Sequence, residues 1–198
     1  DLLITTLAQQ RFAVFFNAGE NQFEYASDAS GLSRITKLRS GWGLGAADFD
    51  NDGRKEMFLA AGHVMDNIER SQPHVRYLEP PLLLRFDGRR ITDVSSMGGS
   101  LFVQARAGRG LAAADFDNDG GMDIAVSNLN GEAYIAFNRA GRGRWIGVDP
   151  RGCAASREAI GAKIRLTRSD GSQSYATVSR AGSYLSSRDQ RVFFGLGT

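Results

Sequence analysis

Two stretches of the chain carry carboxylates at the same spacing. The first, residues 45–60 (GAADFDNDGRKEMFLA), holds Asp48, Asp50, Asp52 and Glu56. The second, residues 112–127 (AAADFDNDGGMDIAVS), holds Asp115, Asp117, Asp119 and Asp123, each 67 residues after its counterpart. Side chains at positions 1, 3 and 5 of a tight loop can converge on one point, and a carboxylate at position 9 can complete the set. Like charges placed so close repel one another, so the pattern favours a bound cation between them.

The remaining loop positions fit such a site. Gly53 and Gly120, at position 6, allow a sharp turn, and the main-chain carbonyl of position 7 adds another oxygen. An all-oxygen set suits a hard cation, Ca²⁺ before Mg²⁺. We therefore predict two calcium sites. The predicted ligands are Asp48, Asp50, Asp52, Glu56 and the Arg54 carbonyl in the first, and Asp115, Asp117, Asp119, Asp123 and the Gly121 carbonyl in the second.

Neither loop is an EF-hand, which needs a glutamate at position 12 and a helix on each side. Position 12 is Leu59 in one stretch and Val126 in the other, and short apolar runs typical of strands follow position 9. Turn chemistry alone is an alternative interpretation. It explains the asparagines and glycines of the two loops, but not eight acids in register.

Composition limits the function further. No apolar run approaches the roughly 18 residues of a membrane span, and no signal peptide is visible. The single Cys153 excludes an intrachain disulfide framework and leaves export open. Residues 1–138 hold 13 Lys and Arg against 18 Asp and Glu, whereas residues 139–198 hold 11 against 4. The excess of positive charge in residues 139–198 suits contacts with the acidic residues 1–138. It also suits an anionic partner such as a polysaccharide or a lipid head group. No motif indicates nucleic-acid binding.

The chain is expected to be all-β, with strands almost throughout. Three strands are predicted in residues 1–26, four around the first acidic loop and three around the second. Units of about 60 residues with four strands are typical of propeller blades, and the glycine- and alanine-rich first strands fit an innermost position. The run WIGVD at residues 145–149 is predicted to be a strand, either the outer strand of the last unit or the first of a further sheet.

These motifs resemble known families. The DFDNDG loops with their flanking strands resemble FG-GAP or VCBS-type repeats, the blades of integrin-α-like β-propellers. Residues 156–167 (SREAIGAKIRLT), 179–187 (SRAGSYLSS) and 192–197 (VFFGLG) resemble the ASPIC/UnbV domain, although Ser156 stands where asparagine is expected. Together they resemble bacterial relatives of the cartilage acidic protein family. The resemblance implies an exported, calcium-binding and non-catalytic protein.

We expect residues 1–144 to form two to three blades of a partial propeller, and residues 145–198 to form a small β-rich ASPIC/UnbV-like module. Asp1 precedes LLITTL as Asp123 precedes IAVS, so Asp1 is interpreted as position 9 of a third loop. The chain is therefore expected to be part of a longer protein. The tail module should pack on the last blade, with Trp145 buried at the junction and Trp42 packed between blades.

Catalysis is the weaker hypothesis. The candidate side chains, all in the excursion at residues 62–81, are His63, His74 and Tyr77. No nucleophile-elbow or zinc-helix motif accompanies them, and Ser30, Ser95 and Ser96 lack a motif context. We expect a non-enzyme at the cell surface, in the periplasm or outside the cell, acting as a binding, adhesion or scaffold element for a protein or polysaccharide. The alternatives are an accessory subunit of a surface or membrane-associated assembly, and part of a carbohydrate-active propeller enzyme.

Overall fold

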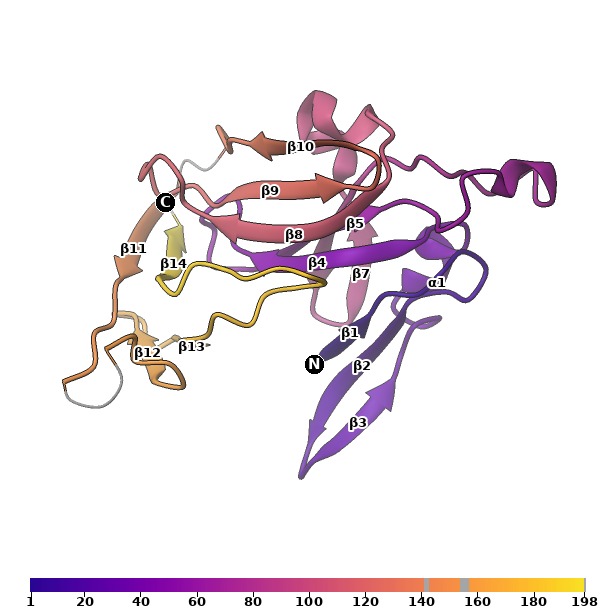
Figure 1. The fold of residues 1–198 in the computed structure, drawn as a ribbon. Helices are drawn as coiled ribbons and strands as arrows, with labels where there is room; N and C mark the ends of the chain where they lie inside the picture. The colour runs from indigo at the N-terminus through magenta and orange to yellow at the C-terminus, as the bar shows by residue number, and fades with distance from the viewer. Residues whose placement is uncertain (141–142, 154–156, 198) are drawn as a thin grey trace.

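The computed structural model describes residues 1–140, 143–153 and 157–197. It is all-β: 43% of its residues lie in strands, and its described part has one short α-helix, α1 (Leu32–Thr36). The strands form several small antiparallel sheets, none of which is closed (Figure 1). None of the helices in these ranges is long and apolar enough to cross a membrane. Ser156 lies outside the described residues.

The first two sheets follow the chain order. The strands are β1 (Leu2–Ile4), β2 (Ala13–Gly19) and β3 (Gln22–Tyr25) in one sheet, and β4 (Gly41–Ala47), β5 (Glu56–Ala61), β6 (Leu82–Asp87) and β7 (Arg90–Asp93) in the other. The excursion at residues 62–81 lies between β5 and β6 and contains a short 3-10 helix, η1 (Ile68–Arg70). The predicted three-strand and four-strand units are both present.

The third sheet consists of β8 (Gly108–Ala114), β9 (Asp123–Asn128) and β10 (Gly131–Ala136). Two more 3-10 helices, η2 (Ser95–Met97) and η3 (Gly99–Val103), lead into it. Strands β4 and β8 lie side by side (Figure 1). A Cβ on Gly43 would come within 2.6 Å of the Arg109 carbonyl oxygen, so the small residues of these strands permit their close approach.

The C-terminal residues build two further strand pairs. Strand β11 (Arg144–Val148) pairs with β14 (Val192–Gly197), and β12 (Lys163–Thr167) pairs with β13 (Gln173–Thr177). Because β11 pairs with β14 and not with β10, the strand predicted at 145–149 begins a further sheet. The chain between β13 and β14 runs back along β4 and β8 (Figure 1).

Three clusters of buried apolar side chains hold the sheets. The largest lies between β2, α1, β5, β6 and β7 and includes Phe12, Leu32 and Leu84, none of which has measurable exposure. A second cluster joins β5 to β8 and β9 through Phe58, Leu111 and their neighbours. A smaller one fills the C-terminal pairs. Burying side chains of this size stabilises the fold by roughly 1.5–3 kcal/mol each.

The two tryptophans lie in different surroundings. Trp145 is 40% exposed, so the prediction that its ring is buried is wrong. The ring lies against Gly120 of the second acidic loop and 5.9 Å from the ring of Phe193. Trp42 is half-buried between the Arg109 guanidinium, 4.5 Å away, and the ring of Tyr184, 4.9 Å away. Trp42 therefore contacts the C-terminal part of the chain as well as a neighbouring strand.

Candidate metal centre

The two acidic loops connect equivalent strands and are held by matching hydrogen bonds. The first joins β4 to β5 and the second joins β8 to β9. In each loop the position-1 carboxylate accepts the main-chain N–H groups of positions 5 and 6. Asp48 accepts them from Asp52 and Gly53 at 3.0 and 2.8 Å, and Asp115 accepts them from Asp119 and Gly120 at 3.1 and 3.0 Å. The loop thus folds around its first acid.

Backbone conformation in the loops follows the residue types. The asparagines at position 4, Asn51 and Asn118, both have φ of 59°, a left-handed conformation that asparagine tolerates. The glycines at position 6, Gly53 and Gly120, have φ of 93° and 84°. The DNDG sequence therefore produces the same sharp turn twice.

The carboxylate at position 9 closes each loop from the following strand. Glu56 accepts the main-chain N–H of Phe49 at 3.2 Å, and Asp123 accepts that of Phe116 at 2.9 Å. The other oxygen of Asp123 accepts the N–H of Asn138 at 2.7 Å. Asp1, directly before β1, accepts the N–H of Asn17 at the same distance, 2.7 Å.

These contacts bring three acids together in each loop. Ligand oxygens of the three members lie within 4.8 Å of one another, with the members at positions 1, 3 and 9. The trios are Asp48, Asp50 and Glu56, and Asp115, Asp117 and Asp123. Two oxygens bound to one Ca²⁺ at about 2.3–2.6 Å can be at most about 5.2 Å apart, so each trio has dimensions that fit the ion.

The position-5 acids, predicted as ligands, are not part of either trio. Asp52 accepts the N–H of Arg54 at 2.7 Å, and Asp119 accepts that of Gly121 at 2.8 Å, so both carboxylates close a local turn. That turn uses one oxygen and leaves the other for further contacts. The ligand roles of these two acids and of the Arg54 and Gly121 carbonyls stay predictions.

An arginine is paired with each acidic loop. Arg85, from β6, donates to Glu56 at 3.1 Å and to Asp50 at 2.8 Å. Arg139 donates to Asp117 at 2.6 Å and to Asp119 at 2.9 Å. The second loop keeps four acids against Arg139, and the first, which also contains Arg54 and Lys55, keeps four acids against three cations, so each loop retains a net negative charge that suits a cation.

Burial accentuates this charge imbalance. Glu56 and Asp123 are buried, with exposed fractions of 1% and 0%. Burial raises the pKa of Asp48, Glu56 and Asp123 above their usual values, and neighbouring carboxylates raise all three further. The same burial would favour a divalent cation, which neutralises these groups without protonation.

The two loops are in contact with each other. The side-chain amide of Asn51 donates to the carbonyl of Gly120 at 3.1 Å, and that of Asn138 donates to the carbonyl of Phe49 at 2.6 Å. The candidate metal sites are therefore neighbouring parts of one structural unit.

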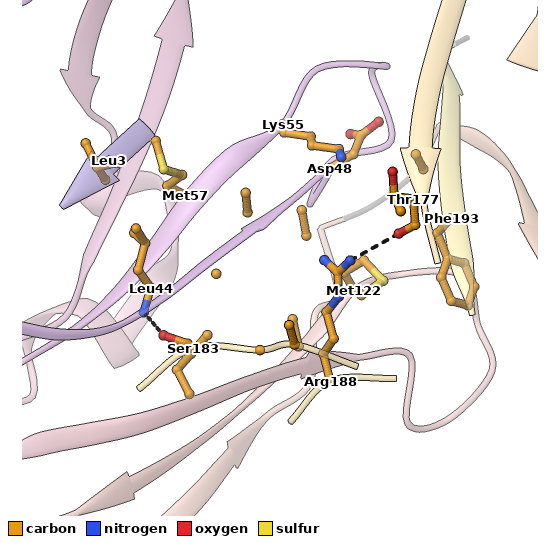
Figure 2. A pocket seen from close by; sticks show the side chains of 18 of the residues that line it. Leu3, Leu44, Asp48, Lys55, Met57, Met122, Thr177, Ser183, Arg188 and Phe193 are labelled. Carbon is orange, nitrogen blue, oxygen red and sulfur yellow. Dashed lines mark hydrogen bonds between the residues drawn. The ribbon is translucent and has the colours of Figure 1, made fainter. Parts of the chain in front are cut away.

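A cavity of about 760 Å³ opens beside the first loop (Figure 2). Its apolar end is formed by Leu3, Leu44 and Met57, and its polar end has Lys55 and Arg188. The cavity walls lower the pKa of Lys55 by removing water, and the positive charge of Arg188 lowers it further. Asp48 lines the same end, and Asp189 there is paired with Arg191, so Lys55 and Arg188 suit an anionic group once a metal ion holds Asp48.

The three residues considered for catalysis are His63, His74 and Tyr77, and each lies in its own surroundings in the excursion at residues 62–81. The Nδ1 atom of His63, which is buried, accepts the N–H of Met65 at 3.1 Å, a contact within its own loop. His74 is exposed, and Tyr77 is half-buried with its main-chain N–H donated to Glu69. Their side chains contribute no described hydrogen bond to one another.

Comparison with known families identifies the C-terminal part of the chain. The model of the family described as ASPIC and UnbV matches residues 152–198. The chain is therefore all-β, and its residues 152–198 correspond to an ASPIC/UnbV domain. A comparison with curated proteins found no match. Strand β11 precedes the matched residues but pairs with β14 inside them, so the folded module extends ahead of the match.

The sequence analysis missed Arg85, Arg139 and also Arg191, which donates to the carbonyl oxygen of Asp115 in the second loop. Arg85 is the lone charge in the apolar run LLLRF, and such a residue in a buried strand requires a partner. That signal indicates that Arg85 needs an acidic partner, but not which one. Arg139 and Arg191 lie in segments with several charged residues. Their sequence surroundings therefore do not distinguish them from ordinary surface arginines.

Proposed function

We propose that the protein is an exported, calcium-stabilised, non-catalytic binding or scaffold element. The observation that carries this proposal is the pair of carboxylate trios, each with oxygens within 4.8 Å, built by two loops with the same hydrogen bonds. Calcium sites of extracellular modules have Kd values of about 10⁻⁴–10⁻³ M, a range filled outside the cell and not in the cytosol. Location at the cell surface, in the periplasm or outside the cell follows from the same proposal.

The loops also support a relationship to FG-GAP or VCBS-type propeller blades and to the cartilage acidic protein family. An acidic loop joins the first two strands of both the β4–β7 and the β8–β10 sheets, and β4 and β8 lie side by side. The recurrence of the Asp123–Asn138 contact at Asp1 and Asn17 extends the likeness to the first sheet. The ASPIC/UnbV match is the partner domain that this relationship implies.

Calcium binding is tested directly by calorimetric titration of the metal-free protein. We expect two sites, and we expect Asp115→Asn combined with Asp123→Asn to remove one of them. Free Ca²⁺ at 100 times Kd should stabilise the fold by about 2.7 kcal/mol, seen as a higher melting temperature than in chelator. A matched control is Asp28→Asn combined with Asp93→Asn, which removes the same charge outside both loops. Identical melting curves in calcium and in chelator would reject the structural role.

The proposed binding partner is a protein or a polysaccharide. The cavity beside Lys55 and Arg188 supports an acidic polysaccharide, because calcium on Asp48 and the pairing of Asp189 with Arg191 would leave these two cations unopposed at its polar end. Retention on an immobilised acidic polysaccharide such as alginate should exceed retention on neutral dextran and should weaken as salt screens the charges. Lys55→Gln should reduce it, whereas Lys37→Gln, at an exposed lysine outside the cavity, should not. Equal retention of both variants would exclude this cavity as the binding place.

A second candidate function is that of an accessory subunit in a larger surface assembly. Strand β10 has a single neighbour, β9, among the described strands, and Ile135 and Phe137 at this edge are 55% and 49% exposed. Unpaired edges with apolar side chains invite pairing with another chain. Isolation of the protein from its native source would separate the two candidates, because a stable complex favours the subunit.

A further inference from the structure

The FGLG end of the C-terminal module lies against the first acidic loop. Gly195, in β14, is so close that a Cβ there would come within 2.1 Å of Oδ2 of Asp48 and 2.6 Å of the Cα of Asn51. Real Cβ atoms do not approach other atoms this closely, so any larger side chain at position 195 would force the strand away. Glycine at this position is explained by contact with a candidate calcium ligand.

Hydrogen bonds fix the same contact. The N–H of Gly197 donates to the carbonyl oxygen of Asn51 at 2.9 Å, and Arg168 donates to the carbonyl oxygen of Gly195, also at 2.9 Å. Asn51 is the position-4 residue whose left-handed backbone shapes the turn. The first bond links β14 to the turn of the first loop, the second lies within the module and fixes Gly195, and β14 packs closely against the first acid, Asp48.

The module also holds the second loop. Arg191 donates to the carbonyl oxygen of Asp115 and to the side-chain oxygen of Asn118, each at 2.7 Å. Its remaining nitrogen, Nε, is paired with Asp189 at 2.6 Å, so its charge is offset within the module. The indole of Trp145 covers Gly120, where a Cβ would come within 1.9 Å of the ring.

We infer that the two acidic loops are the docking surface of the C-terminal module, and that docking and calcium binding favour each other. The coupling rests on the proposed calcium binding. The docked module orders the loop backbone at positions 1 and 4, so the ion does not have to supply that ordering free energy. Because coupling between two binding events is reciprocal, calcium strengthens docking by the same factor.

The variant that tests this inference is Gly195→Ala, with Gly131→Ala as its matched control. A Cβ at Gly131 would meet nothing closer than 3.5 Å, so this control changes the same atoms without a clash. Calorimetry should show calcium binding to the first loop weakened about 5- to 150-fold in Gly195→Ala, the usual range of coupling between sites. Binding in Gly131→Ala should equal that of the unmodified protein.

Hydrogen exchange on the unmodified protein gives a second measurement that needs no folded variant. The amides of β11 and β14 should exchange faster in chelator than in calcium, and by a larger factor than those of β2 and β3, which lie outside the docking surface. Equal calcium affinity in Gly195→Ala, or equal calcium dependence of exchange in both sets of strands, would overturn the coupling and leave the metal sites in place. Absence of calcium binding to the unmodified protein would overturn the proposed function and the coupling together.

Discussion

The side-chain amide of Asn51 reaches the carbonyl oxygen of Gly120, 69 residues away along the chain, at a distance of 3.1 Å. Asn51 is only 2% exposed, and its left-handed backbone directs the amide across to the second loop. This contact makes the two acidic loops neighbours within one hydrogen-bonded unit. The order of one loop therefore depends on the order of the other.

Asn51→Gly should lower the free energy of unfolding by about 1–2 kcal/mol. Glycine keeps the positive φ but removes the amide, which leaves the buried carbonyl of Gly120 without this donor. Asn130→Gly is the control, since Asn130 has φ of 53° in an exposed turn and so reports the backbone effect alone. Urea denaturation of both variants measures the difference. Equal destabilisation would mean that the link between the loops contributes nothing.

Arg85→Gln should destabilise the protein most when calcium is absent. The change leaves the buried Glu56 and its neighbour Asp50 without their cation, and breaking such a pair costs about 3 kcal/mol. A calcium ion neutralises the same carboxylates, so the loss should shrink when calcium is present. Thermal melts of the variant in chelator and in calcium measure the two values.

Arg54→Gln is the control for this prediction. Arg54 and its partner Asp87 are 67% and 79% exposed and 3.7 Å apart, so their pairing is worth about 0–1 kcal/mol. The Arg54→Gln variant should lose little stability, and this loss should be the same with and without calcium. If Arg85→Gln showed the same calcium-independent loss, the arginine and the ion would not share the carboxylates.

Local sequence predicted much of this structure. The three sheets of residues 1–138 and the two turns follow from short apolar runs and from the DNDG residues, because strand alternation and turn conformation depend on neighbours. The grouping of positions 1, 3 and 9 follows from the same local geometry. The position-5 acids were harder to predict, because a ligand and a turn-closing carboxylate require the same residue type.

Long-range contacts could not be predicted in the same way. Strand β11 pairs with β14, and β14 also contacts the first loop, through residues that are distant in sequence. The pairing of Arg85 with Glu56 depends on the register of β5 and β6. Nothing in the local pattern around Trp145 indicates that its ring lies on Gly120, since that position is set by the docking of the module.

Glu79 should make stability depend on pH. Its carboxylate is 2% exposed and accepts the N–H of Ser40 with both oxygens, at 3.1 and 3.2 Å, while Arg39 lies 3.9 Å away. Burial raises the pKa of Glu79 from its usual 4.5 to about 7. Between these values the folded protein binds a proton that the unfolded chain does not, so this contribution to stability is full below pH 4.5 and is lost as pH rises through 7.

Glu79→Gln should remove this pH dependence, because the amide is neutral and still accepts the Ser40 N–H. Relative to the unmodified protein, the variant should gain up to about 3 kcal/mol between pH 4.5 and pH 8. Glu132→Gln, at an exposed glutamate of β10, is the control and should show no such gain. Denaturant unfolding across this pH range gives the values. A constant difference between Glu79→Gln and the unmodified protein would contradict the prediction.

The segment between β13 and β14 should protect the free edges of the two small-residue strands. The hydroxyl of Ser183 accepts the N–H of Leu44 in β4, and that of Ser186 accepts the N–H of Leu111 in β8 at 2.7 Å. These N–H groups lie on strand edges, and Leu111 is buried with an exposed fraction of 2%. Without the hydroxyls, both donors would lose their partners, and water reaches the buried Leu111 poorly.

The double variant Ser183→Ala with Ser186→Ala should therefore unfold at lower denaturant concentration, with a loss of about 1–3 kcal/mol for each unpaired donor. It should also self-associate more readily, since unpaired strand edges pair with other chains. Ser100→Ala, at an exposed serine, is the control. Denaturation measures the first effect and light scattering at increasing protein concentration measures the second. If the double variant matched Ser100→Ala in both, the segment would lie beside β4 and β8 without stabilising them.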